Sequence, residues 1–147
     1  MMYLLDASAL VPLLSEFGEQ LIVRAAEMRL FTLDLAVYEA GNSLWKLSTL
    51  LRSVSLGDAA EAMGVLRVVV VRGIVQAARF GELDLTRALE MASEEGITFY
   101  DSSYILAAES RAATLVTEDR KLREVASKYV DTVAYTDFQR EVMLGKR

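Results

Sequence analysis

Met2-Tyr3-Leu4-Leu5-Asp6-Ala7-Ser8-Ala9-Leu10-Val11-Pro12-Leu13-Leu14 is a short apolar run that meets one acid and then continues apolar. Residues 3–5 show no polar alternation, which is typical of a strand buried on both faces in a parallel sheet. Asp6 stands where this strand should end and a helix begin. Because open α/β sheets bind ligands at the carboxyl ends of their strands, Asp6 is the first candidate for chemistry. The alternative is that Asp6 only caps the helix by accepting a backbone N–H.

Two later stretches repeat this pattern of an apolar run followed by an acid. Residues 97–100 lead to Asp101 at the start of a predicted helix, and residues 114–117 lead to Asp119 before another. Because side chains alternate along a strand, Thr117 and Asp119 should point to the same side. For both acids, helix capping is again the alternative.

A fourth acid, Glu39, lies in a long predicted helix over residues 35–51. It falls on the border of the apolar stripe of that helix, from which a carboxylate can reach into a cleft. Asn42 lies one turn further on the same side, where it either steadies Glu39 or holds a water on a metal. The alternative is an ordinary solvated glutamate.

The composition limits the chemistry available to the chain. Its 147 residues fit one domain over residues 1–147, and 53% of them are hydrophobic. The strand and helix pattern predicts a three-layer α/β/α fold with a central, mostly parallel sheet. The chain has no Cys and no His, which excludes thiolate or His-ligated metal sites and His-based triads.

Four carboxylates in one crevice would repel one another and destabilise the fold unless something positive holds them. The species that suits oxygen ligands without His or Cys is a hard divalent cation, Mg²⁺ or Mn²⁺. Such an ion activates a water and neutralises charge that develops on a phosphate. The hydroxyls of Thr117 and Ser8 can orient a carboxylate or a water there.

The ordered set of motifs resembles a PIN domain of the VapC toxin type over essentially the whole chain. The matching residues are Leu5-Asp6-Ala7-Ser8-Ala9-Leu10, Glu39 with Asn42, Tyr100-Asp101-Ser102-Ser103-Tyr104, Leu115-Val116-Thr117-Glu118-Asp119 and Asp137-Phe138. The resemblance implies a Mg²⁺- or Mn²⁺-dependent endoribonuclease, with Asp6, Glu39, Asp101 and Asp119 as metal ligands and Thr117 as the accompanying hydroxyl. It also implies a toxin held inactive by a small VapB-like antitoxin, and a homodimer built through helices.

RNA cleavage by a metal-activated water is therefore the favoured function. Arg120, Lys121 and Arg123 follow Asp119 directly and are candidates for phosphate contacts, although they also suit a solvated helix face. Ser8 and Asn42 are further candidates for substrate contacts. The net charge of −5 does not exclude RNA, since 17 acids and 16 bases remain once the four candidate ligands are set aside.

Two other functions fit parts of the pattern. A Mg²⁺-dependent phosphoryl-transfer domain, receiver- or phosphatase-like, also places an Asp at a strand end, but it adds a Lys at a neighbouring one. Here every lysine falls in a predicted helix or in the C-terminal tail. A catalytically inactive PIN-fold binding module is the other alternative, and the intact set of four acids argues against it.

No apolar segment reaches the roughly 20 residues that span a bilayer, and the first residues lack a signal-peptide pattern. We therefore expect a cytoplasmic protein without a membrane partner. The high apolar content also favours a homodimer, with residues 7–29 and 65–71 as candidate contact segments.

Overall fold

A five-stranded sheet forms the centre of the molecule. The computed structural model describes residues 1–145. All strand pairs are parallel and the strand order is β3-β2-β1-β4-β5. The strands are β1 (Met2–Leu5), β2 (Arg29–Leu33), β3 (Val75–Ala78), β4 (Thr114–Val116) and β5 (Thr132–Val133).

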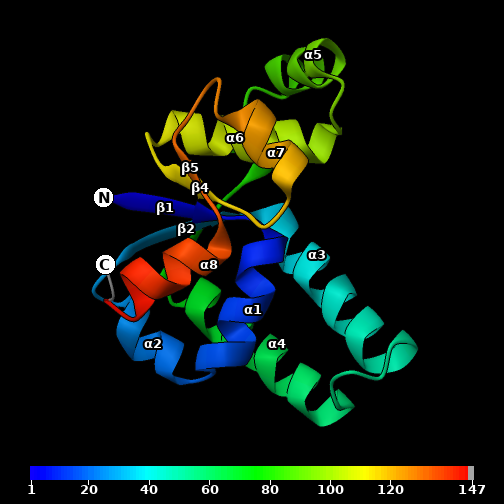
Figure 1. The fold of residues 1–147 in the computed structure, drawn as a ribbon, viewed down its shortest axis with the longest axis vertical. Helices are drawn as coiled ribbons and strands as arrows, with labels where there is room; N and C mark the ends of the chain where they lie inside the picture. Colours follow the sequence, from blue (N-terminus) through cyan, green and yellow to red (C-terminus); the bar gives the residue numbers. More distant parts are fainter. Residues whose placement is uncertain (146–147) are drawn as a thin grey trace.

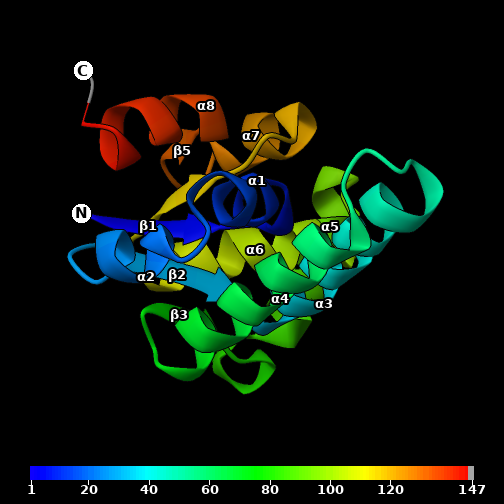
Figure 2. The same ribbon diagram turned by 90° about the horizontal axis from the view of Figure 1, so that it is seen from below.

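Helices cover both faces of this sheet (Figures 1 and 2). The first face carries α1 (Ala7–Phe17), α2 (Gln20–Ala25), α3 (Asp34–Trp45) and α4 (Leu56–Val71). The other carries α6 (Phe99–Ser110) and α7 (Arg120–Ala126), with α5 (Leu85–Glu95) packed on α6. The expected three-layer α/β/α fold is confirmed.

Three short segments and a last helix complete the chain. A π-helical turn, Lys46–Leu50, continues α3, and a 3₁₀ turn, Phe80–Glu82, follows β3. Helix α8 (Tyr135–Phe138) runs into a second π-helical turn, Gln139–Met143. The ring of Phe138 packs edge-on against Tyr3 of β1, with 5.1 Å between the ring centroids.

The first strand is the centre of the fold, as its unbroken apolar pattern predicts. Leu4 and Leu5 are fully buried. In the sheet, Leu4 lies between Phe31 of β2 and Leu115 of β4. Burial from both faces explains why this strand carries no polar residue before Asp6.

The strand order changes direction between β1 and β4, and this position decides where a ligand can bind. From β1 the chain steps outward to β2 and β3, whereas from β4 it steps the opposite way to β5. The connections therefore leave on opposite faces, and a crevice opens at the carboxyl ends of these two strands. Asp6 directly follows β1, and Thr117 directly follows β4.

One expected strand is absent from the described chain. Residues 97–100 do not pair with the sheet, because Thr98 caps α6 by accepting the backbone N–H of Asp101 at 3.0 Å. The helix therefore starts at Phe99, and Asp101 lies in its first turn, so Asp101 is not a strand-end acid. Within the described residues, no helix has the length and apolarity needed to cross a bilayer.

Candidate active site

Asp6 is held by hydrogen bonds at the end of β1. Its Oδ1 accepts the backbone N–H of Ala9 at 3.0 Å, so it caps α1, and also the Ser8 hydroxyl at 2.7 Å. The Thr117 hydroxyl donates to Oδ2. Burial raises the pKa of Asp6, and the hydrogen bonds from Ser8, Thr117 and Ala9 oppose that rise. Capping and a place at the sheet edge are thus both true of this residue.

Thr117 connects the two strand ends. Besides Asp6, its Oγ1 accepts the backbone N–H of Asp119 at 3.0 Å. Asp119 in turn caps α7, where its Oδ1 accepts the backbone N–H of Leu122 at 3.0 Å. Asp119 Oδ2 accepts no hydrogen bond from residues 1–145, which leaves this oxygen for a ligand.

Glu39 reaches the same region from α3. The hydroxyl of Tyr104, on α6, donates to Glu39 Oε1 at 2.6 Å. Tyr104 is buried, and burial followed by the hydrogen bond to Glu39 raises its pKa well above the usual range. The hydroxyl therefore stays protonated and holds the carboxylate in one orientation.

Asp101 completes the set from the first turn of α6. Its carboxyl is half-buried, and burial is the largest cause of its raised pKa. The charge of Asp119 raises it further, and that of Glu39 adds to the effect. Since Glu39 also raises the pKa of Asp6, the acids lie close enough to influence one another electrostatically.

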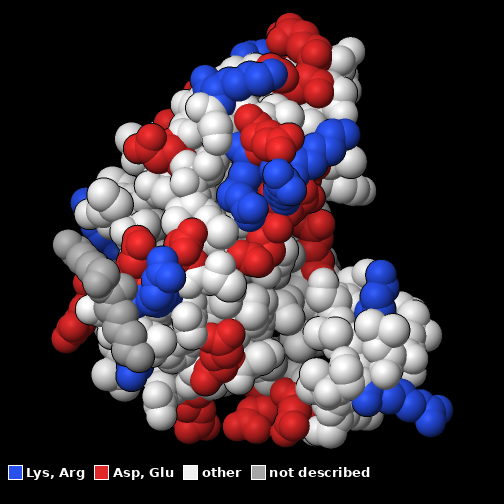
Figure 3. All heavy atoms as spheres, viewed as in Figure 1, with Lys and Arg blue, Asp and Glu red and all other residues white. Residues whose placement is uncertain are grey.

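All four acids line one cavity of about 490 Å³. Figure 3 shows acidic side chains in a recess between the α7 side of the molecule and the projecting ends of α3 and α4. No Lys or Arg lies among the lining residues in the described part of the chain. The lining is Asp6, Ala7, Ser8, Leu35, Tyr38, Glu39, Asn42, Ser43, Tyr100, Asp101, Tyr104 and Asp119.

Comparison with known proteins decides the family. The PIN domain family model matches residues 3–128. The chain belongs to the PIN-domain family. This match spans all four acids, Thr117 and every strand of the sheet except β5.

Characterised relatives of this PIN domain carry VapC names. Exonuclease VapC9 of Pyrobaculum aerophilum is 40% identical over 120 residues, 82% of each chain. Ribonuclease VapC3 of the same organism is 33% identical over 132 residues, 84% of this chain and 94% of the relative. A crystal structure of P. aerophilum PAE2754 matches with a TM-score of 0.73 and 32% identity, covering 98% and 96% of the two chains. The chain is a PIN domain of VapC type, a family whose named members here are nucleases.

The chemistry of the PIN-domain cavity fits a hard cation. Its charged ligands are all carboxylates, and hydroxyl and amide oxygens from Ser8 and Asn42 lie beside them. Within residues 1–145, no three acids converge tightly enough to hold an ion by themselves. Mg²⁺ and Mn²⁺ keep several waters when bound, so ligands spread around a cavity of this size suit them better than a close protein cage would.

The predicted substrate contacts divide into two groups. Ser8 and Asn42 line the cavity. The three basic residues of α7 lie outside its lining: Arg123 donates to the carbonyl of Thr117 at 2.8 Å, and Arg120 faces Glu124 at 3.6 Å. Lys121 donates to the carbonyl of Gly96 at 3.3 Å, and its charge partly offsets the raised pKa of Asp101. Their contact with RNA stays a prediction.

Sequence reasoning missed three tyrosines of this cavity: Tyr38, Tyr100 and Tyr104. Tyr104 lies three residues after Asp101, on the same side of α6, and this spacing was a usable signal. Tyr38 and Tyr100 each directly precede a candidate metal ligand. Their exposure, which the sequence does not reveal, is what separates them from Tyr104.

Proposed function

We propose that this PIN domain is a Mg²⁺- or Mn²⁺-dependent endoribonuclease that hydrolyses RNA phosphodiesters. The observation that carries the proposal is the cavity at the reversal of strand order, walled by four carboxylates and without a basic residue in the lining of the described chain. A site of this charge has no use for a polyanion unless cations enter first. The four acids Asp6, Glu39, Asp101 and Asp119 would hold them.

The chain's own residues position these ligands. Ser8, Thr117 and the backbone of Ala9 fix Asp6, and Tyr104 fixes Glu39. When bound, a divalent cation lowers the pKa of a water and offsets charge that develops on the phosphate. Preset hydroxyl donors reduce the reorganisation needed at the moment of reaction.

The relatives support RNA as substrate but differ on the mode of attack. One is named a ribonuclease and the other an exonuclease. A covalently closed RNA circle separates the two modes, because it has no end for an exonuclease to start from. An endoribonuclease converts the circle to a linear product, and a circle that stays intact while linear RNA of the same sequence is shortened would contradict our assignment.

A phosphoryl-transfer domain of receiver or phosphatase type fits the structure less well. Such a site needs a lysine beside its nucleophilic Asp. Among the described residues, none of those lining the cavity around Asp6 is a lysine. A catalytically inactive binding module stays an alternative that only the cleavage assay removes.

The biological role follows from the VapC names. We propose a cytoplasmic toxin restrained by a small VapB-like antitoxin, and active as a homodimer. Exposed Val23 on α2 and Val71 on α4 lie in the two segments predicted to form the dimer. Light scattering at micromolar concentration should give twice the monomer mass of 16.3 kDa, whereas the monomer mass would remove the dimer from the proposal.

The proposal is tested by measuring Mn²⁺ binding and RNA cleavage together. Wild-type protein should cleave RNA with Mg²⁺ or Mn²⁺, lose activity in EDTA and recover it when the metal is restored. Titration calorimetry should give Mn²⁺ binding that Asp119→Asn weakens. Cleavage that is indifferent to EDTA would contradict the metal role, and Mn²⁺ binding without any cleavage would favour the inactive module.

A further inference from the structure

Two exposed tyrosines stand at the candidate active site. Tyr38 on α3 is 80% exposed and Tyr100 on α6 is 56% exposed, and both line the acidic cavity. Each directly precedes one of the acids, Glu39 or Asp101. Large aromatic rings left in water at the rim of a cavity are candidates for ligand contact.

The other tyrosines of the described chain show what a structural role looks like here. The hydroxyls of Tyr104, Tyr129 and Tyr135 each donate to a glutamate, at 2.6, 2.6 and 3.0 Å. Tyr3 packs against Phe138. Within residues 1–145, the hydroxyls of Tyr38 and Tyr100 take no partner, and neither ring is buried in the core. Packing and hydrogen bonding therefore do not account for these two side chains.

The helices place the two rings on opposite sides of the acids. Successive residues of a helix point about 100° apart, so an acid directed into the cavity leaves the preceding tyrosine at its rim. Helices α3 and α6 belong to opposite layers of the fold (Figure 1). A phosphate held among the acids would thus have one exposed ring on each wall.

We propose that Tyr38 and Tyr100 are stacking platforms for the bases that flank the scissile phosphate, so the substrate is unpaired RNA. This inference rests on the proposed nuclease function. The cavity lining offers no lysine or arginine among the described residues, so direct attraction for the phosphates is weak and other contacts must supply affinity. Base stacking on an aromatic ring supplies it for single strands, whose bases are free, but not for a duplex, whose bases already stack on one another.

The first test is steady-state cleavage of a single-stranded RNA by Tyr38→Ala and Tyr100→Ala. Loss of one stacked base should raise KM roughly 5- to 140-fold, the equivalent of about 1–3 kcal/mol, with a smaller change in kcat. Tyr38→Phe and Tyr100→Phe keep the ring and should stay within about twofold of wild type. Phe80→Ala is the matched control, because Phe80 is 68% exposed but lies outside the cavity lining.

An abasic substrate shows whether the ring acts on a base. With the flanking bases of the same RNA removed, wild type should lose affinity, and the alanine substitutions should cause no further loss. A fully duplex RNA should be cleaved at least tenfold less efficiently than the single strand.

Failure of this inference is distinguishable from failure of the nuclease assignment. A wild-type protein that cleaves no RNA overturns both. A wild-type protein that cleaves, with unchanged KM in both alanine variants, overturns only the stacking role. Equal losses in the alanine variants on normal and abasic RNA, or equal cleavage of duplex and single strand, would also overturn it.

Discussion

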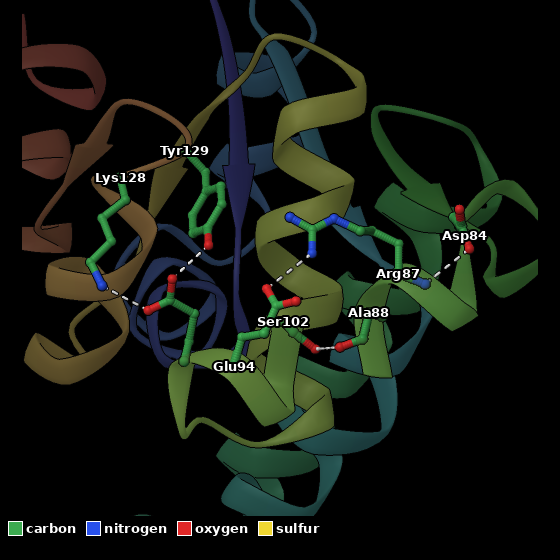
Figure 4. A network of polar contacts seen from close by, with 8 residues as sticks. Asp84, Arg87, Ala88, Glu94, Ser102, Lys128 and Tyr129 are labelled. Atoms are coloured by element: carbon green, nitrogen blue, oxygen red, sulfur yellow. Dashed lines mark hydrogen bonds and ion pairs between the residues drawn. The ribbon is translucent and has the colours of Figure 1, made fainter. Parts of the chain in front are cut away.

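Acidic residues occur in two contrasting settings in this PIN domain. At the end of α5, Glu95 accepts hydrogen bonds from Lys128 at 2.7 Å and Tyr129 at 2.6 Å, and Arg87 faces Glu94 at 3.5 Å (Figure 4). In the cavity, burial raises the pKa of Asp6 and Asp101.

The difference shows where the fold supplies its own counter-charge and where it does not. Glu95 is complete without a ligand, because a lysine and a phenol already meet its oxygens. The cavity acids gain hydroxyl and backbone donors but no lysine or arginine in the lining formed by the described residues. Their mutual repulsion is a cost that an external cation removes, so we assign catalysis to the second setting and structure to the first.

The largest effect should come from removing one cavity charge. Asp119→Asn keeps a capping side chain at the start of α7, since Asn caps about as well as Asp, so the fold should persist. Cleavage should fall by at least about 100-fold, more than the 10- to 100-fold typical of residues that only orient a metal ligand. The measurement is kcat/KM with Mn²⁺, alongside circular dichroism to check the fold. Asp6→Asn, which also keeps a cap, should lose activity in the same way.

Glu95→Gln is the matched control for this loss, because it removes a carboxylate charge from the structural setting. Its kcat/KM should stay within about threefold of wild type, since surface substitutions away from a site rarely matter more. Comparable losses in Glu95→Gln and Asp119→Asn would erase the distinction between the two settings.

A smaller effect should follow from removing the hydroxyl that orients Glu39. In Tyr104→Phe the ring still fills its buried place, but Glu39 Oε1 loses its donor. We expect kcat/KM to fall roughly 10-fold and Mn²⁺ affinity to weaken, as for other residues that support a metal ligand. Unchanged Mn²⁺ affinity by calorimetry would mean that Glu39 is not a ligand or needs no support.

The smallest effect concerns the pH dependence of stability in the metal-free protein. Because the pKa of Asp101 is raised in the folded state, its contribution is most favourable below its unfolded value and is lost as pH rises through the folded one. For Glu95 the pKa is lowered, so its contribution is present above the unfolded value and is lost as pH falls.

Urea unfolding of wild type and Asp101→Asn between pH 4 and 7 measures this term. The variant should gain stability relative to wild type as pH rises, by less than about 1 kcal/mol because water still screens the half-buried side chain. A difference that is constant over this range would show that Asp101 titrates as it does in the unfolded chain.

The placement of Asp6 and Asp119 was predictable from sequence because each lies within three residues of a buried strand. Local pattern thus decides their place at the sheet edge. The strand expected before Asp101 was wrong, because a capping hydroxyl at Thr98 outweighed the apolar and aromatic run that follows it.

The contacts between distant residues were not predictable. The hydrogen bond between Tyr104 and Glu39 joins α6 to α3, and only the packing of two layers around the sheet brings these residues together. The same holds for Arg123, whose guanidinium turns back to the carbonyl of Thr117. Charge and helical position alone favoured a free basic face there.

The central claim is that the cavity acids lack a counter-charge that a divalent cation supplies. Thermal melts of wild type, Asp101→Asn and Glu95→Gln, each with EDTA and with Mn²⁺ at about 100 times its Kd, test it most directly. Wild type should gain about 5 to 10 °C from Mn²⁺, which corresponds to about 2.7 kcal/mol of linked binding energy. Asp101→Asn should melt above wild type in EDTA and gain less from metal, whereas Glu95→Gln should melt slightly lower in EDTA and gain as much as wild type. Equal metal gains in all three proteins would contradict the claim.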